Sequence, residues 1–422
     1  MNILVVGGGG REHAIAWRLA QSNKVKKIYV APGNAGTSLE KKITNVPLTS
    51  IKELVAFAIE KAIQMTVVGP EAPLSEGIVD AFIEQGLKIF GPVAAAAQLE
   101  SSKDFAKQFM ANHNIPSGEY RTFTDPESAH TYISKKGAPI VVKADGLAAG
   151  KGVIVAMTEP EAHDAVDMML IDNGMGIAGA KVVIEEFLAG EEASFIVMID
   201  GENILPLATS QDHKRLLNND LGPNTGGMGA YSPAPVISPA IHSQVMKEVI
   251  EPVVEGMKAA GTPFVGFLYA GLMIAPDGAI KVLEFNCRLG DPETQPIMMR
   301  LKSDLLTLVD HALTGTLDKI KSEWDQRTAL GVVLAAKDYP QSPRKGDVIT
   351  VKDIDSENVK IFHAGTSKRG EKIVTSGGRV LCVTALAETV GQARDMALKA
   401  GESINFSGKQ FRTDIGNRAI KR

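Results

Sequence analysis

The segment from Val141 to Val153 carries the clearest chemical pattern in the sequence, because lysines alternate there with glycines. These residues are Lys143, Gly146, Gly150, Lys151 and Gly152. Glycine N–H groups and lysine ammonium ions are suitable donors to phosphate oxygens. The segment is no Walker A loop, since three residues separate Gly146 from Gly150 and Lys151 precedes Gly. A solvated glycine hairpin is the alternative, but Lys143 ends an apolar run and needs an anionic partner. We predict a flap over phosphates.

Glu284 and Asn286 end another apolar run and stand two residues apart, so in a strand their side chains share one face. Both offer oxygen ligands, which Mg²⁺ prefers, and phosphate oxygens and water would complete its coordination. A polar outward face of an edge strand is the alternative. Cys287 would point inward, where a core thiol is expected.

The run Val183–Glu186 leads into a polar bend that contains Glu192. A nucleotide base can bond to the backbone at a strand end, and a nearby carboxylate can accept ribose hydroxyls. A solvated acidic turn is an equally good interpretation of this segment alone. The polar run 211–215 likewise fits either a solvated loop or a functional one.

The loop Gly7–Gly10 precedes a helical pattern, and the N–H groups at such a helix start can hold phosphate. The dinucleotide fingerprint fails here, because Glu12 stands at the third glycine position and no acidic residue closes the second strand. A nicotinamide dehydrogenase is therefore disfavoured. His13 is expected to cap or pack.

The first hundred residues must position these loops. Apolar runs at 3–6, 27–31, 65–68 and 87–90 are each followed by a turn, and helical patterns lie between them. This order predicts a doubly wound parallel sheet. The loops at Gly7, Pro32 and Gly69 would lie on its carboxyl edge, where ligands bind in such sheets.

The middle of the chain changes to hairpins, which indicates a new domain. Ser101 is the expected N-cap of a helix, and strands 139–144 and 152–156 surround the glycine segment. Lys181–Glu186 and Ala193–Ile199 are expected to form a second strand pair. Residues 205–235 are loop-rich and fit a binding loop.

We predict three domains with mixed α/β and α+β folds. They are an N-terminal substrate-binding domain (1–101), a central domain with a flap subdomain at about 123–190 (102–328), and a small α+β domain (329–422).

Composition excludes several classes of protein. The 422 residues carry a net charge of −4, which argues against bulk binding of nucleic acid or anionic lipid. Two cysteines exclude a disulfide scaffold and favour a reduced, cytoplasmic setting. No apolar run approaches the ~18 residues of a membrane span. The N-terminus is expected to form a buried strand and not a signal peptide.

Eight stretches together resemble the ATP-grasp enzymes, and most closely the phosphoribosylamine–glycine ligase family. They are GGREHA (9–14), APGNAGT (31–37), VGPEAPL (68–74), KADGLAAGKGV (143–153), EEFLAGEEASF (185–195), SQDHKR (210–215), GPNTGGMGAYSPAP (222–235) and EFNCRLGDPETQP (284–296). The last two are far more specific than a general ATP motif.

This resemblance implies ATP-dependent ligation of glycine to 5-phosphoribosylamine through glycyl phosphate, the second step of purine synthesis. It implies ATP and Mg²⁺ or Mn²⁺ as cofactors, a cytoplasmic monomer, and no nucleic-acid or membrane partner. The residues it implies for ATP are Lys103, Lys143, the 146–152 flap, Glu185, Glu186, Phe187, Leu188 and, for the ribose, Glu192. The metal ligands would be Glu284 and Asn286. Phosphoribosylamine would lie near Gly9, Gly10, Asn34, Asp212 and Gly227. The catalytic candidates are Arg288, Asp291 and Asp212, with Arg288 facing the glycine carboxylate or acyl phosphate.

Two alternatives remain open beside this function. Another ATP-grasp carboxylate–amine ligase would keep the same nucleotide residues. A non-catalytic nucleotide-binding regulator could also keep them, but it would need neither the metal pair nor the loop at 222–235.

Overall fold

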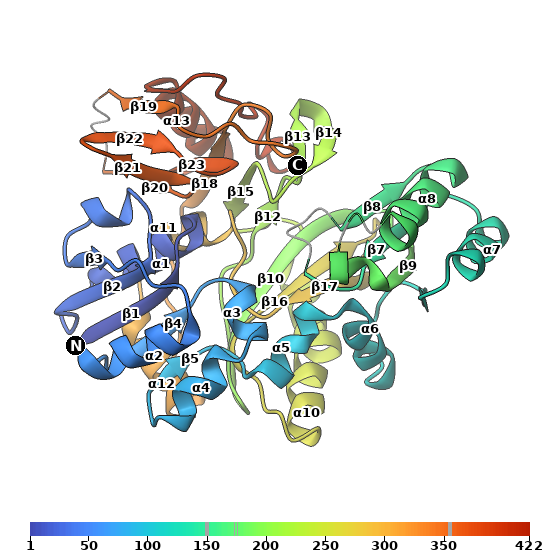
Figure 1. The fold of residues 1–422 in the computed structure, drawn as a ribbon, viewed down its shortest axis with the longest axis horizontal. Helices are drawn as coiled ribbons and strands as arrows, with labels where there is room; N and C mark the ends of the chain where they lie inside the picture. Colours follow the sequence, from blue (N-terminus) through green and yellow to red (C-terminus); the bar gives the residue numbers. More distant parts are fainter. Residues whose placement is uncertain (148–151, 173, 175, 353–356) are drawn as a thin grey trace.

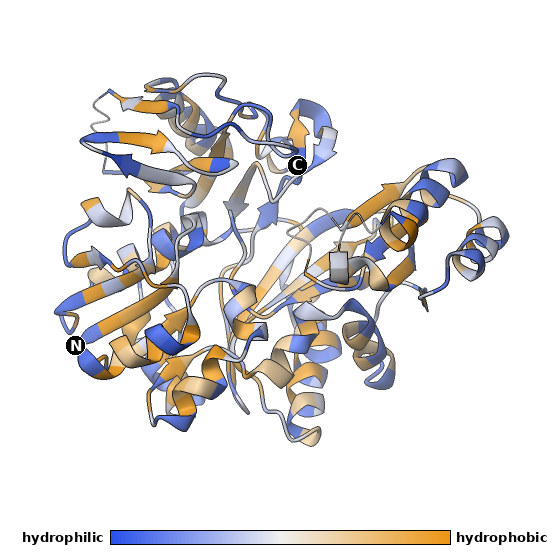
Figure 2. Cartoon of the chain, in the orientation of Figure 1, coloured by the Kyte–Doolittle hydropathy of each residue, from blue (hydrophilic) through white to orange (hydrophobic). Residues whose placement is uncertain are grey.

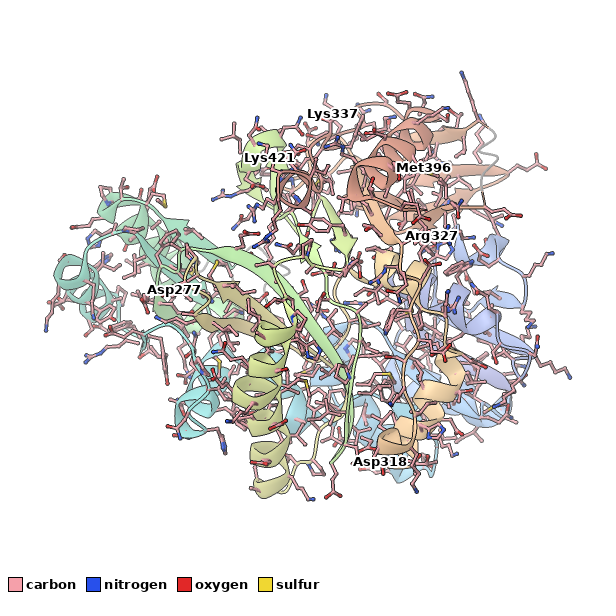
Figure 3. The ribbon with its side chains drawn as sticks, turned by 180° about the vertical axis from the view of Figure 1, so that it is seen from behind. Asp277, Asp318, Arg327, Lys337, Met396 and Lys421 are labelled. Carbon is pink, nitrogen blue, oxygen red and sulfur yellow. The ribbon has the colours of Figure 1, made fainter. Side chains whose placement is uncertain are left out.

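The computed structural model describes residues 1–147, 152–172, 174, 176–352 and 357–422 (Figure 1). An N-terminal domain, a central region with a protruding flap subdomain and a C-terminal domain surround the middle of the molecule. Viewed from behind, Lys337 and Met396 mark the C-terminal domain, and Asp318 lies at the opposite end (Figure 3). No described helix is long and apolar enough to cross a bilayer.

The N-terminal domain is a parallel sheet with strand order β3-β2-β1-β4-β5. Ile3 and Val5 face one hydrophobic cluster with α1, whereas Leu4 and Val6 face another with α2 and α4. Burial on both faces confirms the predicted doubly wound sheet. Its elements are β1 (Asn2–Gly7), α1 (Gly10–Ala20), β2 (Lys27–Pro32), η1 (Thr37–Leu39), β3 (Ile43–Asn45), α2 (Ile51–Glu60), β4 (Met65–Val68), α3 (Glu71–Ser75), α4 (Ile78–Glu84), β5 (Ile89–Phe90) and α5 (Ala94–Ser101).

The flap subdomain is an antiparallel sheet with order β6-β9-β7-β8, and α7 and α8 pack beside each other next to it. It has a hydrophobic cluster of its own. The elements, with the preceding helix, are α6 (Lys103–Asn112), β6 (Tyr120–Phe123), α7 (Pro126–Lys136), β7 (Ile140–Ala144), β8 (Val153–Ala156), α8 (Glu159–Val166), η2 (Asp167–Ile171), η3 (Gly176–Ala180) and β9 (Val182–Glu186).

The central sheet has order β11-β10-β16-β17 and is also antiparallel. The predicted pairing of 181–186 with 193–199 is wrong, because these segments belong to different sheets. Both edges of β9 are filled by β6 and β7, so β10 pairs with β16 and β11 instead. The elements are β10 (Glu191–Asp200), β11 (Ile204–Pro206), α9 (Pro239–Val245), η5 (Met246–Ile250), α10 (Glu251–Ala259), β16 (Val265–Ile274), β17 (Ile280–Asn286), α11 (Thr294–Arg300), α12 (Leu305–Leu313) and η6 (Leu317–Lys319).

The C-terminal sheet, of order β12-β15-β18-β23-β20, takes two strands from the segment expected to be loop-rich. The division at residue 329 stays a prediction, and this sheet spans it. The remaining elements are β12 (Gln211–Asp212), β13 (Arg215–Leu217), η4 (Asn218–Asp220), β14 (Leu221–Asn224), β15 (Gly229–Ser232), β18 (Thr328–Ala335), β19 (Val348–Val351), β20 (Val359–His363), β21 (Thr366–Arg369), β22 (Lys372–Thr375), β23 (Arg379–Ala387), α13 (Val390–Glu402), β24 (Ile404–Asn405) and α14 (Asn417–Ile420).

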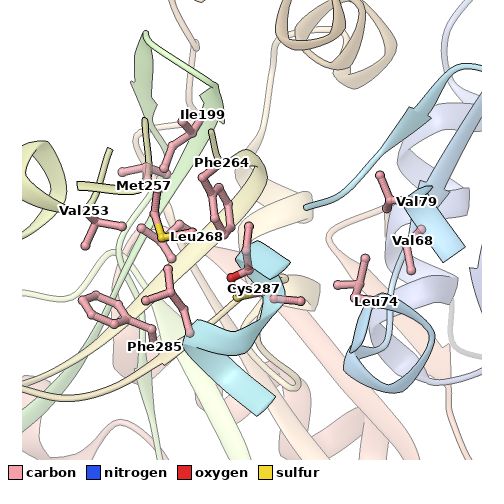
Figure 4. Close-up of a cluster of buried hydrophobic side chains, with 14 of the residues drawn as sticks. Val68, Leu74, Val79, Ile199, Val253, Met257, Phe264, Leu268, Phe285 and Cys287 are labelled. Carbon is pink, nitrogen blue, oxygen red and sulfur yellow. Dashed lines mark hydrogen bonds between the residues drawn. The ribbon is translucent and has the colours of Figure 1, made fainter. Parts of the chain in front are cut away.

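Hydrophobic residues concentrate in the strands and on the inner helix faces (Figure 2). One cluster joins the N-terminal domain to the central sheet, with Val68 and Leu74 on one side and Leu268, Phe285 and Cys287 on the other (Figure 4). Cys287 is a free thiol with 2% of its surface exposed, and burial raises its pKa. The predicted core role of Cys287 is confirmed.

His13 joins the N-terminal domain to the C-terminal domain, which confirms that it packs. Its Nδ1 accepts a hydrogen bond from His363 N at 2.8 Å, and its Nε2 lies 3.2 Å from Glu40 Oε1. Lys360 also pairs with Glu40. Burial lowers the pKa of His13, and burial together with His13 lowers the pKa of His363 to about 3. Glu40, which His13 and Lys360 hold at a pKa of about 2 against the effect of burial, stays ionised.

We expect the protein to lose thermal stability as the pH falls from 7 to 5. The unfolded chain protonates both imidazoles near pH 6.5. The folded chain keeps His363 neutral over this range and protonates His13 only at a lower pH than the unfolded chain does, so each pH unit below 6.5 costs up to about 1.4 kcal/mol per imidazole. Glu40 is ionised in both states over most of this range. Differential scanning fluorimetry should show a shallower loss for His13→Gln than for the parent. An unchanged slope would contradict the assignment.

Candidate active site

Two lysines and a carboxylate are buried together where the flap subdomain meets α6. Lys107 Nζ lies 2.9 Å from Glu185 Oε2, and Lys143 Nζ lies 2.9 Å from Glu185 Oε1. Lys143 also donates to Leu283 O at 3.2 Å. Burial favours a raised pKa at Glu185, but Lys143 and Lys107 outweigh it and hold the pKa below its ordinary value. The group therefore carries one net positive charge beneath the flap.

Lys103 opens α6 next to this group. The predicted cap was Ser101, but the structure places it one residue later, since Phe105 N donates to Ser102 Oγ at 3.1 Å. The shift follows from α5, which includes Ser101 as its last residue. Lys103 Nζ donates to Gly146 O at 3.1 Å, so this lysine contacts the start of the glycine segment.

The described part of the flap is anchored at both ends. Gly146 N donates to Ala178 O at 3.3 Å, and a side chain at Gly146 would collide with Ala178. Gly152 O accepts from Ala144 N at 2.8 Å. Gly150 and Lys151 lie outside the described residues.

The segment after β9 borders the same region. Glu186 is exposed, and its carboxylate accepts from Lys281 Nζ at 2.8 Å and from Glu119 N at 3.1 Å. Phe187 and Leu188 are half-buried. Glu192 on β10 forms an ion pair with Lys214.

The two oxygen donors proposed for a metal lie on one face of β17, because Glu284 stands opposite Gly271 and Asn286 opposite Tyr269. Lys214 Nζ is 3.7 Å from Glu284 Oε1. Burial favours a raised pKa at Glu284, but Lys214, Lys143 and Lys103 lower it to about 2. An ionised carboxylate and a neutral amide oxygen are suitable as two of the ligands of Mg²⁺ or Mn²⁺. No group of three or more His, Cys, Asp or Glu residues suited to a metal occurs among the described residues.

A second compartment lies between the N-terminal and C-terminal domains. It is an open cavity of about 460 Å³. Its lining comprises Gly8, Gly9, Pro32, Gly33, Asn34, Asp291, Tyr339, Ala364, Gly365, Thr366, Ser376, Gly378 and Arg379. Asn34 is a structural element of this wall, since its Nδ2 donates to Gly8 O at 2.9 Å and to His363 O at 2.8 Å. The Gly7 and Pro32 loops thus meet at one sheet edge, as predicted.

The start of α1 differs from the expected phosphate loop in one respect. Gly9 N donates to Glu12 Oε2 at 2.6 Å, so a side-chain carboxylate already takes this N–H group. A Cβ at Gly10 would lie 2.5 Å from Gln295 Nε2, which places Gln295 directly against this loop.

Asp291 lines this cavity, and the cations Arg379 and Arg11 both act on its carboxylate. Its Oδ1 accepts from Gln295 Nε2 at 2.8 Å, and its Oδ2 lies 3.5 Å from Arg379 Nη2. Burial favours a raised pKa at Asp291, but Arg379 and Arg11 hold it below its ordinary value. Gln295 is 1% exposed, and its Oε1 has no hydrogen-bond partner within the described residues.

Asp212 precedes Lys214 by two residues and lies near Arg379 in the cavity wall, since Asp291 and then Asp212 raise the pKa of that guanidinium against the effect of burial. Burial, with the neighbouring carboxylate of Glu293, raises the pKa of Asp212 well above its ordinary value. Gly227 lies directly against it. A Cβ at Gly227 would be 2.7 Å from Asp212 Oδ1 and 2.4 Å from Pro292 Cδ.

Replacing Gly227 with Ala is expected to displace Asp212 and lower activity about tenfold or more, because this residue has φ +112° and no room for a side chain. Initial rates at varied substrate concentration check this result. Gly222→Ala is the control, since Gly222 has φ +79° on the exposed β13–β14 hairpin. Equal rate losses in both variants would assign the effect to backbone strain alone.

Arg288 lies in a charged group on the N-terminal side. Its guanidinium is 2.8 Å from Glu100 Oε1 and 3.2 Å from Glu71 Oε2. Burial opposes its charge, but Glu100 and Glu71 raise its pKa. Both carboxylates would compete with glycine for this guanidinium.

Sequence reasoning missed three of these side chains. Lys107 follows Lys103 by four residues, so the helical period could have placed both on one face. Lys214 belongs to the polar run at 211–215, whose role was left open. Arg379 opens β23 in the C-terminal domain, and no local signal connects it with Asp291.

Comparison with known proteins identifies the chain as an ATP-grasp enzyme, in agreement with its fold. Family models for the phosphoribosylglycinamide synthetase N domain, ATP-grasp (A) domain and C domain match residues 1–100, 101–294 and 329–418. The chain belongs to the phosphoribosylglycinamide synthetase family.

Individual relatives agree with this assignment. Phosphoribosylamine–glycine ligase of Ralstonia nicotianae is 61% identical over 422 residues, with 100% of both chains covered. That of Haemophilus influenzae is 62% identical, covering 100% of this chain and 99% of its own. The crystal structure of the Thermotoga maritima phosphoribosylamine–glycine ligase has a TM-score of 0.86 at 36% identity, covering 98% of this chain and all of that one. Biotin carboxylase of Campylobacter jejuni shares the fold at a TM-score of 0.74 and 15% identity, covering 100% of this chain and 95% of its own.

Proposed function

We propose that this enzyme joins glycine to 5-phosphoribosylamine at the expense of ATP, with glycyl phosphate as the intermediate. The products are glycinamide ribonucleotide, ADP and phosphate. Family membership and full-length relatives that carry this activity in their names support the reaction.

ATP would bind between the flap and the central sheet. Lys103 and Lys143 would contact its phosphates, and Gly146 and Gly152 anchor the flap above them. Glu185, Glu186 and Leu188 would border the adenine, and Glu192 would accept the ribose hydroxyls. Glu284 and Asn286 would hold Mg²⁺ or Mn²⁺, which supplies neutralisation of charge on the phosphates when bound.

Phosphoribosylamine would occupy the cavity between the N-terminal and C-terminal domains. The cavity volume is within the range of small-molecule sites. Arg379 supplies a cation there, and Asp291 supplies an acceptor for hydroxyl or amine protons.

The chemistry then needs two displacements. The glycine carboxylate attacks the γ-phosphorus, and ADP leaves. The amine next attacks the acyl carbon, the C–O bond to phosphate breaks, and a proton leaves the nitrogen. Asp212 is the proposed acceptor of that proton, because its raised pKa gives it more affinity for a proton than an ordinary carboxylate has. No covalent bond to the protein is required, so catalysis consists of positioning and charge stabilisation.

One observation supports this proposal. In the single segment 212–214, Asp212 lies near Arg379 of the cavity wall, and Lys214 lies between Glu192 and Glu284, the residues proposed for the ribose and the metal. The glycyl phosphate formed in the first displacement can therefore react with the amine in the second without leaving the enzyme.

A substrate-omission assay tests the function. Steady ADP release should require ATP, glycine and phosphoribosylamine together, and mass spectrometry should detect glycinamide ribonucleotide. If another carboxylate or amine supports release at least as fast, the enzyme is a different carboxylate–amine ligase of this class. We also expect a cytoplasmic monomer, and light scattering checks its mass.

A further inference from the structure

Lys107 has no role in the function proposed above, yet it is one of the most deeply buried charges among the described residues. Its side chain is 2% exposed, and Glu185 is its carboxylate partner. The centroid of the Tyr120 ring lies 5.9 Å from Lys107 Nζ. Removing an ammonium ion from water costs several kcal/mol, and an apolar side chain would often pack as well. Burial of Lys107 is therefore costly and needs an interaction that explains it.

The interaction is with Glu185, which lies near the end of β9, where the adenine is proposed to bind. Lys143 and Lys107 approach its two oxygens from different elements, β7 and α6. Despite the 2.9 Å separations, Glu185 Oε1 and Lys107 Nζ have no well-directed hydrogen bond within the described residues. Oε1 thus retains capacity to accept a further donor.

Lys143 cannot be the permanent partner of Glu185, because the proposed function also requires it at the phosphates. If Lys143 turned toward ATP, Glu185 would be a buried carboxylate with no counter-ion. Lys107 prevents this, since its ammonium group contacts the other carboxylate oxygen. It lies one helical turn beyond Lys103, on the same face of α6.

We propose that Lys107 is a positioning residue that keeps the Glu185 carboxylate charged and oriented toward the amino group of adenine, and so sets the preference for ATP over GTP. This inference rests on the proposed function. Adenine presents an amino donor at the position where guanine presents a carbonyl acceptor. A fixed carboxylate accepts from the first and repels the second. Without Lys107 the carboxylate can rotate toward Lys143 or take up a proton, and a protonated carboxyl can donate to guanine.

Lys107→Met tests the proposal, because methionine has a similar volume and leaves the Glu185–Lys143 pair neutral. The ratio of kcat/KM for ATP to that for GTP should fall about tenfold or more, with KM for ATP raised more than kcat is lowered. Gln108→Met on the exposed face of the same helix is the matched control and should keep the parent ratio. Calorimetric binding of ADP and GDP should show the same loss of discrimination, and this measurement needs no ligase activity.

A double variant tests whether Lys107 acts through Glu185. Lys107→Met added to Glu185→Gln should reduce the ATP-to-GTP ratio no further than Glu185→Gln alone. Additive losses, or equal losses of kcat with ATP and GTP in Lys107→Met, would overturn the proposal and leave Lys107 a packing residue. If the parent lacks ligase activity but discriminates ADP from GDP through Lys107, the proposed function fails and this inference stands.

Discussion

Glu284→Gln is expected to raise the Mg²⁺ concentration for half-maximal rate by about 10- to 100-fold, which is the loss seen even when an outer partner of a metal ligand is removed. Glu284 is the charged member of the proposed pair, and Asn286 contributes only a neutral oxygen. The carboxylate has a pKa of about 2, so it is fully ionised at neutral pH and the substitution removes a whole charge. A metal titration of the initial rate measures the effect.

The fold should survive this substitution. Glu284 keeps 36% of its side chain exposed, and Lys214 retains Glu192 as an ion-pair partner when Glu284 is gone. Cys287→Ala is the control from the same strand end, because its buried thiol should cost about 1 kcal/mol of stability without changing the metal dependence. A parent-like titration for Glu284→Gln would show that the metal binds elsewhere.

Local pattern was sufficient to predict much of the fold. The strand predicted at 65–68 has those bounds, and the strands predicted at 3–6 and 27–31 are longer by no more than one residue at either end, since each is a short apolar run followed by a turn.

Pairing between distant strands could not be predicted in the same way. Ala193–Ile199 was assigned to the wrong partner, because both edges of β9 are occupied by strands that precede it in the chain. The strand β15 likewise joins β18, almost a hundred residues later. Which edges stay free is decided by the whole sheet and not by either strand.

The same limit applies to the candidate site. Resemblance supplied Lys103, Lys143, Glu185 and Glu284, and the structure gathers these side chains around the flap. Arg379 reaches Asp291 only because the C-terminal sheet packs against the N-terminal loops. Contacts of this kind depend on how the domains pack, so the spacing of residues in the sequence does not predict them.

Asp212→Asn is expected to slow ligation by about 10²- to 10⁴-fold, the usual contribution of a general base. The amide keeps an oxygen that can accept from His213 N, as the carboxylate does, but it cannot take a proton from the attacking amine. Folding should not suffer. A raised pKa means that the ionised carboxylate is less favourable in the folded protein than in the unfolded chain, so its charge costs stability at neutral pH. The melting temperature of Asp212→Asn should therefore equal or exceed that of the parent.

Two measurements separate this role from a general defect in the site. Phosphoryl transfer to glycine does not use Asp212, so ADP formed in the first turnover without phosphoribosylamine should appear at the parent's rate in a rapid-quench experiment. As the pH falls through the raised pKa, the parent's carboxylate takes up a proton and ligation slows. Asp212→Asn should lack this acid limb and retain only the one caused by protonation of the amine. Slow first-turnover ADP release in the variant would mean that Asp212 acts on the nucleotide side, through Lys214, and that another group accepts the proton.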